Sequence, residues 1–160
     1  MPGYRNKDGR GRKPATKSVR YISANLGKRF LRFSFSEDVV ARLCRLDGDQ
    51  LRNGNLNRLR LRPVRYPWLA PHATLFQITE MVDPGTYVLR KGKNHPRWVA
   101  EILAIHFEVK PGVPGHTFTD ISWDHRGMLV QFPLEAMTDE ALERWERIER
   151  WRKLKEAAAG

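Results

Sequence analysis

The chain has 160 residues, 41% of them hydrophobic, and its 29 lysines and arginines outnumber 18 aspartates and glutamates to give a net charge of +11. This length fits one domain with tails, and the charge favours an anionic partner, nucleic acid before an anionic membrane surface. The single cysteine, Cys44, excludes an internal disulfide and a cysteine-cluster metal site. Without an apolar run of membrane-spanning length or a secretory signal, we expect a cytoplasmic protein with no membrane partner.

Most of the excess charge lies at the N-terminus. Ten lysines or arginines fall between Arg5 and Arg32 against one acidic residue, Asp8, and glycine and proline interrupt the segment. We therefore expect residues 1–29 to form a disordered basic tail that contacts nucleic acid. The candidate contact residues of the tail are Arg5, Lys7, Arg10, Arg12, Lys13, Lys17, Arg20, Lys28 and Arg29.

Within this tail, the sequence Arg10-Gly11-Arg12-Lys13-Pro14 resembles the AT-hook core, Arg-Gly-Arg-Pro, with Lys13 inserted before the proline. The resemblance implies that Gly11 lets an extended backbone lie on the floor of an A·T-rich minor groove while the arginines reach along it. Two alternatives stay open. The tail contacts nucleic acid in general, RNA included, or it is solvated or faces a protein.

The next stretch, residues 31–64, shows a clear order of elements. Leu31, Phe33 and Phe35 alternate with polar residues, which predicts a half-buried strand. Ser36 and the acidic residues after it predict the N-terminus of a short helix. Turn signals then lead to residues 58–62, where leucines alternate with arginines in a second strand.

This order, with Gly48-Asp49 after the helix and LRLRPV at the end, resembles the swapped-hairpin half-domain of AbrB/MazE-type DNA-binding proteins. It is also similar to small phage and mobile-element proteins of this pattern. The family implies assembly by dimer swapping and double-stranded DNA binding through basic residues on one face of the hairpins. The residues that match are Arg32, Arg58, Arg60 and Arg62.

The middle of the chain predicts more strands and a second basic cluster. Residues 73–80 and 86–90 read as the two strands of a hairpin, and 98–109 as a strand that ends near Lys110. The loop between the last two strands either contacts phosphates or is solvated. Its cations are Arg90, Lys91, Lys93 and Arg97.

The third part, residues 111–137, predicts strands at 118–123 and 128–132 around a turn. Here lie the only histidines and carboxylates grouped closely enough to test as a site. They are His116, Asp120, Asp124 and His125. No ligand pair has the spacing of a known metal motif, and Asp-His-Arg-Gly is ordinary turn chemistry, so we expect no metal, no cofactor and no enzymatic activity.

The C-terminus predicts a long helix. Thr138 is a favourable N-cap, and apolar residues recur every third position from Leu142 to Leu154. The apolar stripe either packs on the sheet or binds a second copy or another protein. Its candidate partner-binding residues are Trp145, Ile148 and Trp151.

Together these patterns predict an α+β fold of mostly antiparallel strands with one short early helix and a long C-terminal helix. The expected regions are a tail (1–29), a mainly β domain (30–137) and the helix (138–160). The expected function is a small double-stranded DNA-binding transcription regulator, associated with the nucleoid, with DNA favoured over RNA.

Two alternative functions stay open. In the first, the chain is a phage or mobile-element accessory protein that binds a host protein or ribonucleoprotein. In the second, it binds single-stranded nucleic acid by base stacking. The aromatic residues for such stacking are Trp68, Phe76, Tyr87 and Trp98.

Overall fold

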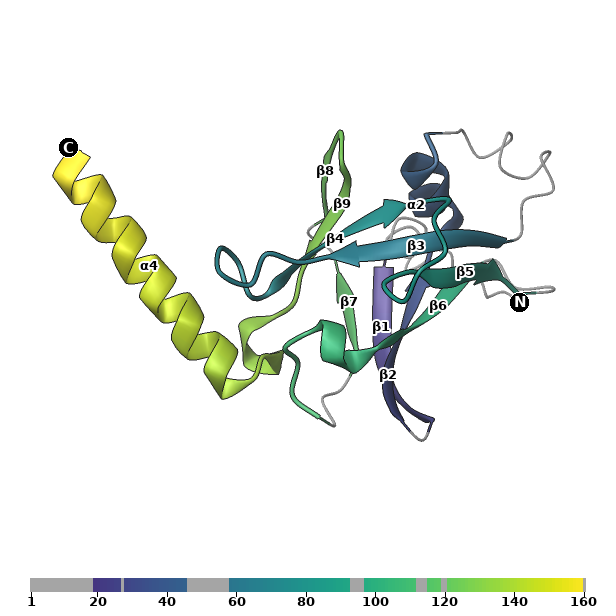
Figure 1. The fold of residues 1–160 in the computed structure, drawn as a ribbon, viewed down its shortest axis with the longest axis horizontal. Coiled ribbons are helices and arrows are strands. Elements are labelled where there is room, and N and C mark those ends of the chain that lie inside the picture. Colours follow the sequence, from purple (N-terminus) through teal and green to yellow (C-terminus); the bar gives the residue numbers. More distant parts are fainter. Residues whose placement is uncertain are drawn as a thin grey trace, which may run out of the picture.

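The computed structural model describes residues 19–26, 28–45, 58–92, 97–111, 115–118 and 121–159. These residues form an α+β fold, in which runs of strands are followed by a short early helix, by two short 3-10 helices and by a long C-terminal helix (Figure 1). The elements are β1 (Val19–Leu26), β2 (Lys28–Phe35), α2 (Glu37–Leu43), β3 (Arg58–Val64), β4 (Ala73–Ile78), β5 (Tyr87–Lys91), β6 (Trp98–Leu103), η1 (Ala104–His106), β7 (His116–Phe118), β8 (Ser122–Asp124), β9 (Gly127–Gln131), η2 (Leu134–Ala136) and α4 (Asp139–Ala159).

The nine strands form one sheet in the order β7-β1-β2-β6-β5-β3-β4-β9-β8, and every neighbouring pair is antiparallel. The sheet curls so that its two ends approach each other across a common core. Phe118 of β7 packs edge-on against Phe132, which follows β9, with 5.3 Å between ring centroids. Val109 and Met137 close the same side through an isolated antiparallel bridge.

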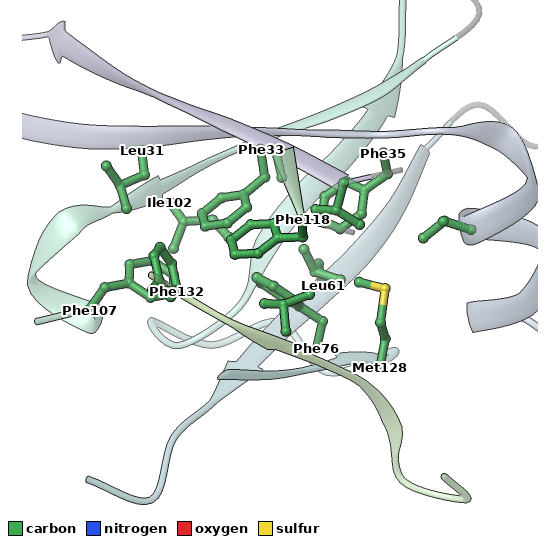
Figure 2. Packing of buried hydrophobic residues seen from close by; sticks show 14 of the residues in the cluster. Leu31, Phe33, Phe35, Leu61, Phe76, Ile102, Phe107, Phe118, Met128 and Phe132 are labelled. Carbon is green, nitrogen blue, oxygen red and sulfur yellow. The ribbon is translucent and has the colours of Figure 1, made fainter. Parts of the chain in front are cut away.

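Aromatic rings fill the inside of this curl. Phe33 lies 5.2 Å from Phe76 and 5.3 Å from Phe107, measured between ring centroids, and Phe35 also packs on Phe76. Figure 2 shows these rings with aliphatic side chains from the surrounding strands. Edge-to-face aromatic pairs add to the gain from burying apolar area, so strands far apart in sequence share one core.

Helix α2 begins directly after β2, as its N-terminal signal predicts. Ser36 occupies the N-cap position, where its backbone carbonyl oxygen accepts the first helical hydrogen bond from Val40 N–H at 3.1 Å, but its side chain makes no capping hydrogen bond; two acidic residues occupy the first turn. Val39 and Val40 are buried against the core. The short helix is therefore held in place by its apolar side, since seven residues are too few for a stable isolated helix.

Helix α4 extends away from the body of the protein (Figure 1). Thr138 Oγ1 accepts a hydrogen bond from Ala141 N–H at 3.3 Å, which confirms the predicted N-cap. The first turns contact the body, where Trp145 lies edge-on to His72 with 4.5 Å between ring centroids. Farther along, Trp151 and Leu154 are 69% and 65% exposed.

The predicted fold class is confirmed, but the prediction of disorder is wrong for residues 19–26 and 28–29, which lie in strands. The sequence predicts disorder through residue 29, whereas β1 begins at Val19 and pairs with β2 from Val19 opposite Phe35 to Leu26 opposite Lys28. Two strands this close in sequence pair at a low cost in loop-closure entropy. We did not predict this strand because residues 19–26 adjoin the basic segment and share its expected disorder.

Three strand predictions are also wrong in part. Residues 73–80 and 86–90 do not pair as a hairpin, because β3 lies between β4 and β5 and pairs with both. The strand predicted over 98–109 ends at Leu103, where η1 begins. The strand predicted over 118–123 is two strands, β7 paired with β1 and β8 paired with β9.

Candidate nucleic-acid interface

The arginines of β3 point away from the core, as their alternation with leucine predicts. Leu61 of β3 and Leu89 of β5 are fully buried, so Arg58, Arg60 and Arg90 lie on the opposite face. Arg58 lies directly opposite Arg90 in the pairing of β3 with β5. We call Arg58, Arg60 and Arg90 the arginine face.

Within the described residues, the side chains of the arginine face form no ion pair with a carboxylate, although the charge of Arg60 contributes, after the hydrogen bonds from Arg62 and Gly85, to the lowered pKa of Asp83. The backbones of the three arginines take part in strand pairing, but none of their side chains donates a hydrogen bond to another described residue, and Arg58 and Arg90 are exposed. Like charges directly opposite each other on neighbouring strands are unfavourable in a sheet. The positive charge of this face is therefore available to an anionic partner.

The neighbouring arginines of the same side are engaged within the protein. Arg32 forms an ion pair with Glu101 at 3.0 Å, and Arg62 forms one with Asp83 at 2.9 Å. The hydrogen bond from Arg62 is the main reason that the pKa of Asp83 lies below its ordinary value. Arg62 borders the arginine face, whereas Arg32 lies on β2, two strands away from β5, and both arginines carry compensated charge.

The basic cluster predicted over residues 90–97 does not act as one unit. Arg90 belongs to the arginine face, whereas Arg97 donates hydrogen bonds to the side chain and the carbonyl oxygen of Ser34. Lys91 forms an ion pair with Glu37 of α2 at 3.2 Å. Arg97 thus connects the start of β6 to β2, and Lys91 connects β5 to α2.

The side chains of several predicted contact residues lie outside the part of the chain that the structure describes. The backbone of Arg20 lies in β1, and that of Lys28 and Arg29 in β2, but their side chains are outside the description. The AT-hook-like sequence also lies outside the described residues. The same holds for Arg5, Lys7, Arg10, Arg12, Lys13, Lys17 and Lys93.

The predicted stacking residues do not form a platform for bases. Phe76 and Trp98 have no exposed surface, so the prediction that they stack on bases is wrong. Tyr87 is partly buried, and its hydroxyl forms a hydrogen bond with Nε2 of His106. Of the four candidates, Trp68 alone is well exposed, at 67%.

A cleft that sequence reasoning missed lies between the end of α2, the end of β4 and the β8–β9 hairpin. Its volume is about 690 Å³, and four arginines, two aspartates and Trp123 line it. The guanidinium of Arg42 lies 4.4 Å above the ring of Trp123. Arg62 lines this cleft as well as bordering the arginine face, so the two surfaces are continuous.

The candidate partner-binding residues of α4 divide between two environments. Trp145 contacts His72 of the body, Ile148 is partly buried, and Trp151 is exposed. Packing on the body therefore accounts for the start of the stripe. Binding of a second copy or a host protein by its distal part stays a prediction.

The described residues contain no group of three or more histidine, cysteine, aspartate or glutamate side chains that could hold a metal ion. The part of the chain that the structure describes also has no helix with the length and apolar character needed to cross a membrane. Comparisons with protein-family models, curated proteins and solved structures find no match to this chain.

Proposed function

We propose that the arginine face binds the phosphate backbone of nucleic acid, with double-stranded DNA as the main partner. The observation that carries the proposal is the direct opposition of Arg58 and Arg90 on neighbouring strands without a carboxylate between them. Such an arrangement disfavours the free protein and favours a complex in which phosphates lie between the charges.

The charge of the whole chain supports the same conclusion. A net charge of +11 attracts nucleic acid over distances beyond direct contact and favours rapid association. The N-terminal cations add to this attraction, and the AT-hook-like sequence would give a preference for narrow A·T-rich minor grooves. Backbone contacts by arginine fix position and affinity rather than base sequence, which suits a small DNA-binding regulator that reads groove shape.

The proposal is tested by binding to duplex DNA across a salt series. The triple variant R58Q/R60Q/R90Q is compared with R147Q/R150Q/K153Q on α4, which removes the same charge far from the arginine face. If each face arginine contacts a phosphate, the slope of log K against log salt should fall by about 0.9 per arginine, or about 2.7 in all. The α4 variant should keep a slope close to that of the wild type.

Equal slopes for the two triple variants would overturn the proposal, because the binding would then report net charge alone. Chains beginning at residue 18 test the tail separately with A·T-rich and G·C-rich duplexes. Loss of an A·T preference on truncation would support minor-groove binding by the tail. Duplex RNA of the same length measures the preference for DNA.

A further inference from the structure

We propose that the cleft between α2 and the β8–β9 hairpin binds a nucleotide, with the base stacked on Arg42 and Trp123 and the phosphate held by Arg45. This inference concerns a site separate from the arginine face. The cleft could also hold an unpaired nucleotide that belongs to a DNA strand, and this second form of the inference rests on the proposed function.

The net positive charge of the cleft lining favours an anionic ligand. Its two aspartates are each paired, Asp83 with Arg62 at 2.9 Å and Asp124 with Arg126 at 2.9 Å. Arg42 and Arg45 form no ion pair within the described residues. Among the described residues, the lining of the cleft therefore carries two positive charges that no ion pair compensates.

Arg45 is the side chain best suited to a phosphate. One nitrogen of its guanidinium, Nη2, donates to the carbonyl oxygen of His125 at 2.7 Å, which fixes the side chain at the cleft. A guanidinium carries five N–H donors, and the remaining donors of Arg45 have no partner within the described residues, so they can bind phosphate oxygens. Arg126 has fewer to offer, because both its Nε and its Nη2 already donate to Asp124.

Arg42 and Trp123 provide a surface for a flat ring. The guanidinium of Arg42 covers one side of the indole at 4.4 Å, and Arg42 is itself exposed. Bases stack on guanidinium planes as well as on aromatic rings, so a base can lie on the outer side of Arg42 as the third layer. The volume of about 690 Å³ lies within the range of small-molecule sites and leaves room for a nucleotide.

The first experiment is an NMR titration of the full chain with adenosine 5′-monophosphate, following the indole N–H signal of Trp123, assigned through W123F. We expect a saturable shift, and binding at least about tenfold weaker for ribose 5-phosphate, which lacks the ring. R42Q and R45Q should each weaken nucleotide binding by about tenfold or more. W123F should retain binding, and R147Q, an exposed α4 change of equal charge, should have no effect.

Two results would overturn the nucleotide site. Ribose 5-phosphate could bind as tightly as the nucleotide, which would mean an anion site without stacking. Alternatively, R42Q and R45Q could behave like R147Q, which would place any binding elsewhere. Because both arginines are exposed, unchanged spectra away from the cleft show that the variants are folded.

The second experiment separates a free nucleotide from one within a strand. A duplex with one unpaired, extrahelical nucleotide should bind more tightly than the fully paired duplex of the same length, and R42Q should abolish this difference. R58Q/R60Q/R90Q should weaken both duplexes and leave nucleotide binding unchanged. Nucleotide binding without duplex preference assigns the cleft to a free nucleotide, and nucleotide binding without duplex binding overturns the proposed function alone.

Discussion

Glu108 links α4 to the body, and its removal should loosen the start of the helix. Its carboxylate accepts hydrogen bonds from Arg65 and Arg144, each at 2.7 Å. Arg65 also donates to the carbonyl oxygens of Pro71 and His106, so one charge network joins three segments. In Glu108→Gln, two arginines would remain close together without the carboxylate that neutralises them.

The burial of this network sets the expected magnitude. The side chains of Glu108 and Arg65 are 23% and 14% exposed, between the exposed pairs that contribute about 0–1 kcal/mol and the buried pairs whose disruption costs about 3–5 kcal/mol. We expect E108Q to lower the free energy of unfolding by about 1–3 kcal/mol. Glu101→Gln, which breaks the more exposed pair with Arg32, should cost less than about 1 kcal/mol.

Urea denaturation gives the change in stability, and amide hydrogen exchange in the first turns of α4 shows where it occurs. The dependence on pH gives a second readout. Burial raises the pKa of Glu108, but hydrogen bonds from Arg144 and Arg65 lower it more, so the pKa lies below the ordinary 4.5. A depressed carboxyl pKa stabilises the fold above pH 4.5, and the stabilisation disappears as the pH falls through the folded value.

The α4 amides of the wild type should therefore lose protection below pH 4.5, with protection measured as the exchange rate relative to that of an unstructured peptide at the same pH, and E108Q should show low protection throughout. If E108Q and E101Q have equal stability, or if E108Q leaves exchange in α4 unchanged, Glu108 does not hold the helix.

Three further substitutions test the core and the caps by urea denaturation. Gly127→Ala should cost about 2–4 kcal/mol, because Gly127 has a φ of +151° and an added Cβ would lie 2.2 Å from the carbonyl oxygen of Phe76. Thr74→Val should be neutral or stabilise the fold by about 1 kcal/mol, because the hydroxyl of Thr74 is buried and has no hydrogen-bond partner among the described residues. Thr138→Ala should cost about 0.5–1 kcal/mol and reduce the helix signal in circular dichroism, because it removes the cap on Ala141 N–H.

Local signals in the sequence were sufficient for several elements. The acidic turn after Ser36 and the Thr138 cap correctly predict where α2 and α4 begin. Alternation of leucine and arginine correctly predicts both β3 and the outward direction of its arginines. In each case, the information lies within a few neighbouring residues, where propensity and periodicity act.

These local signals do not predict which distant segments pair in the sheet. A hairpin between β4 and β5 is the simplest reading of the sequence, but β3 pairs with both strands because Leu61 and Leu89 complete the same core. The cleft was missed for the same reason, since Arg42 and Trp123 meet across 81 positions of sequence. Nothing near either residue indicates the contact, which depends on the order of strands in the sheet.

The ion pairs divide the described arginines into two groups with different roles. Arg32, Arg62 and Arg65 each face a carboxylate, and these pairs join neighbouring strands or loops. Within the described residues, the arginine face and the two arginines Arg42 and Arg45 form no ion pair. Because Arg62 lines the cleft and also adjoins the arginine face, the arginines of the face and those of the cleft lie along one continuous surface of the body.

A strand whose phosphates follow the arginine face would therefore reach the cleft at Arg62. Arginines kept only for solubility have no reason to lie directly opposite each other or to border a common cleft. The arrangement thus favours a single extended ligand that contacts both surfaces. A combined variant, R45Q with R58Q/R60Q/R90Q, should show coupling in binding to the duplex with an unpaired nucleotide, whereas independent ligands would give additive losses.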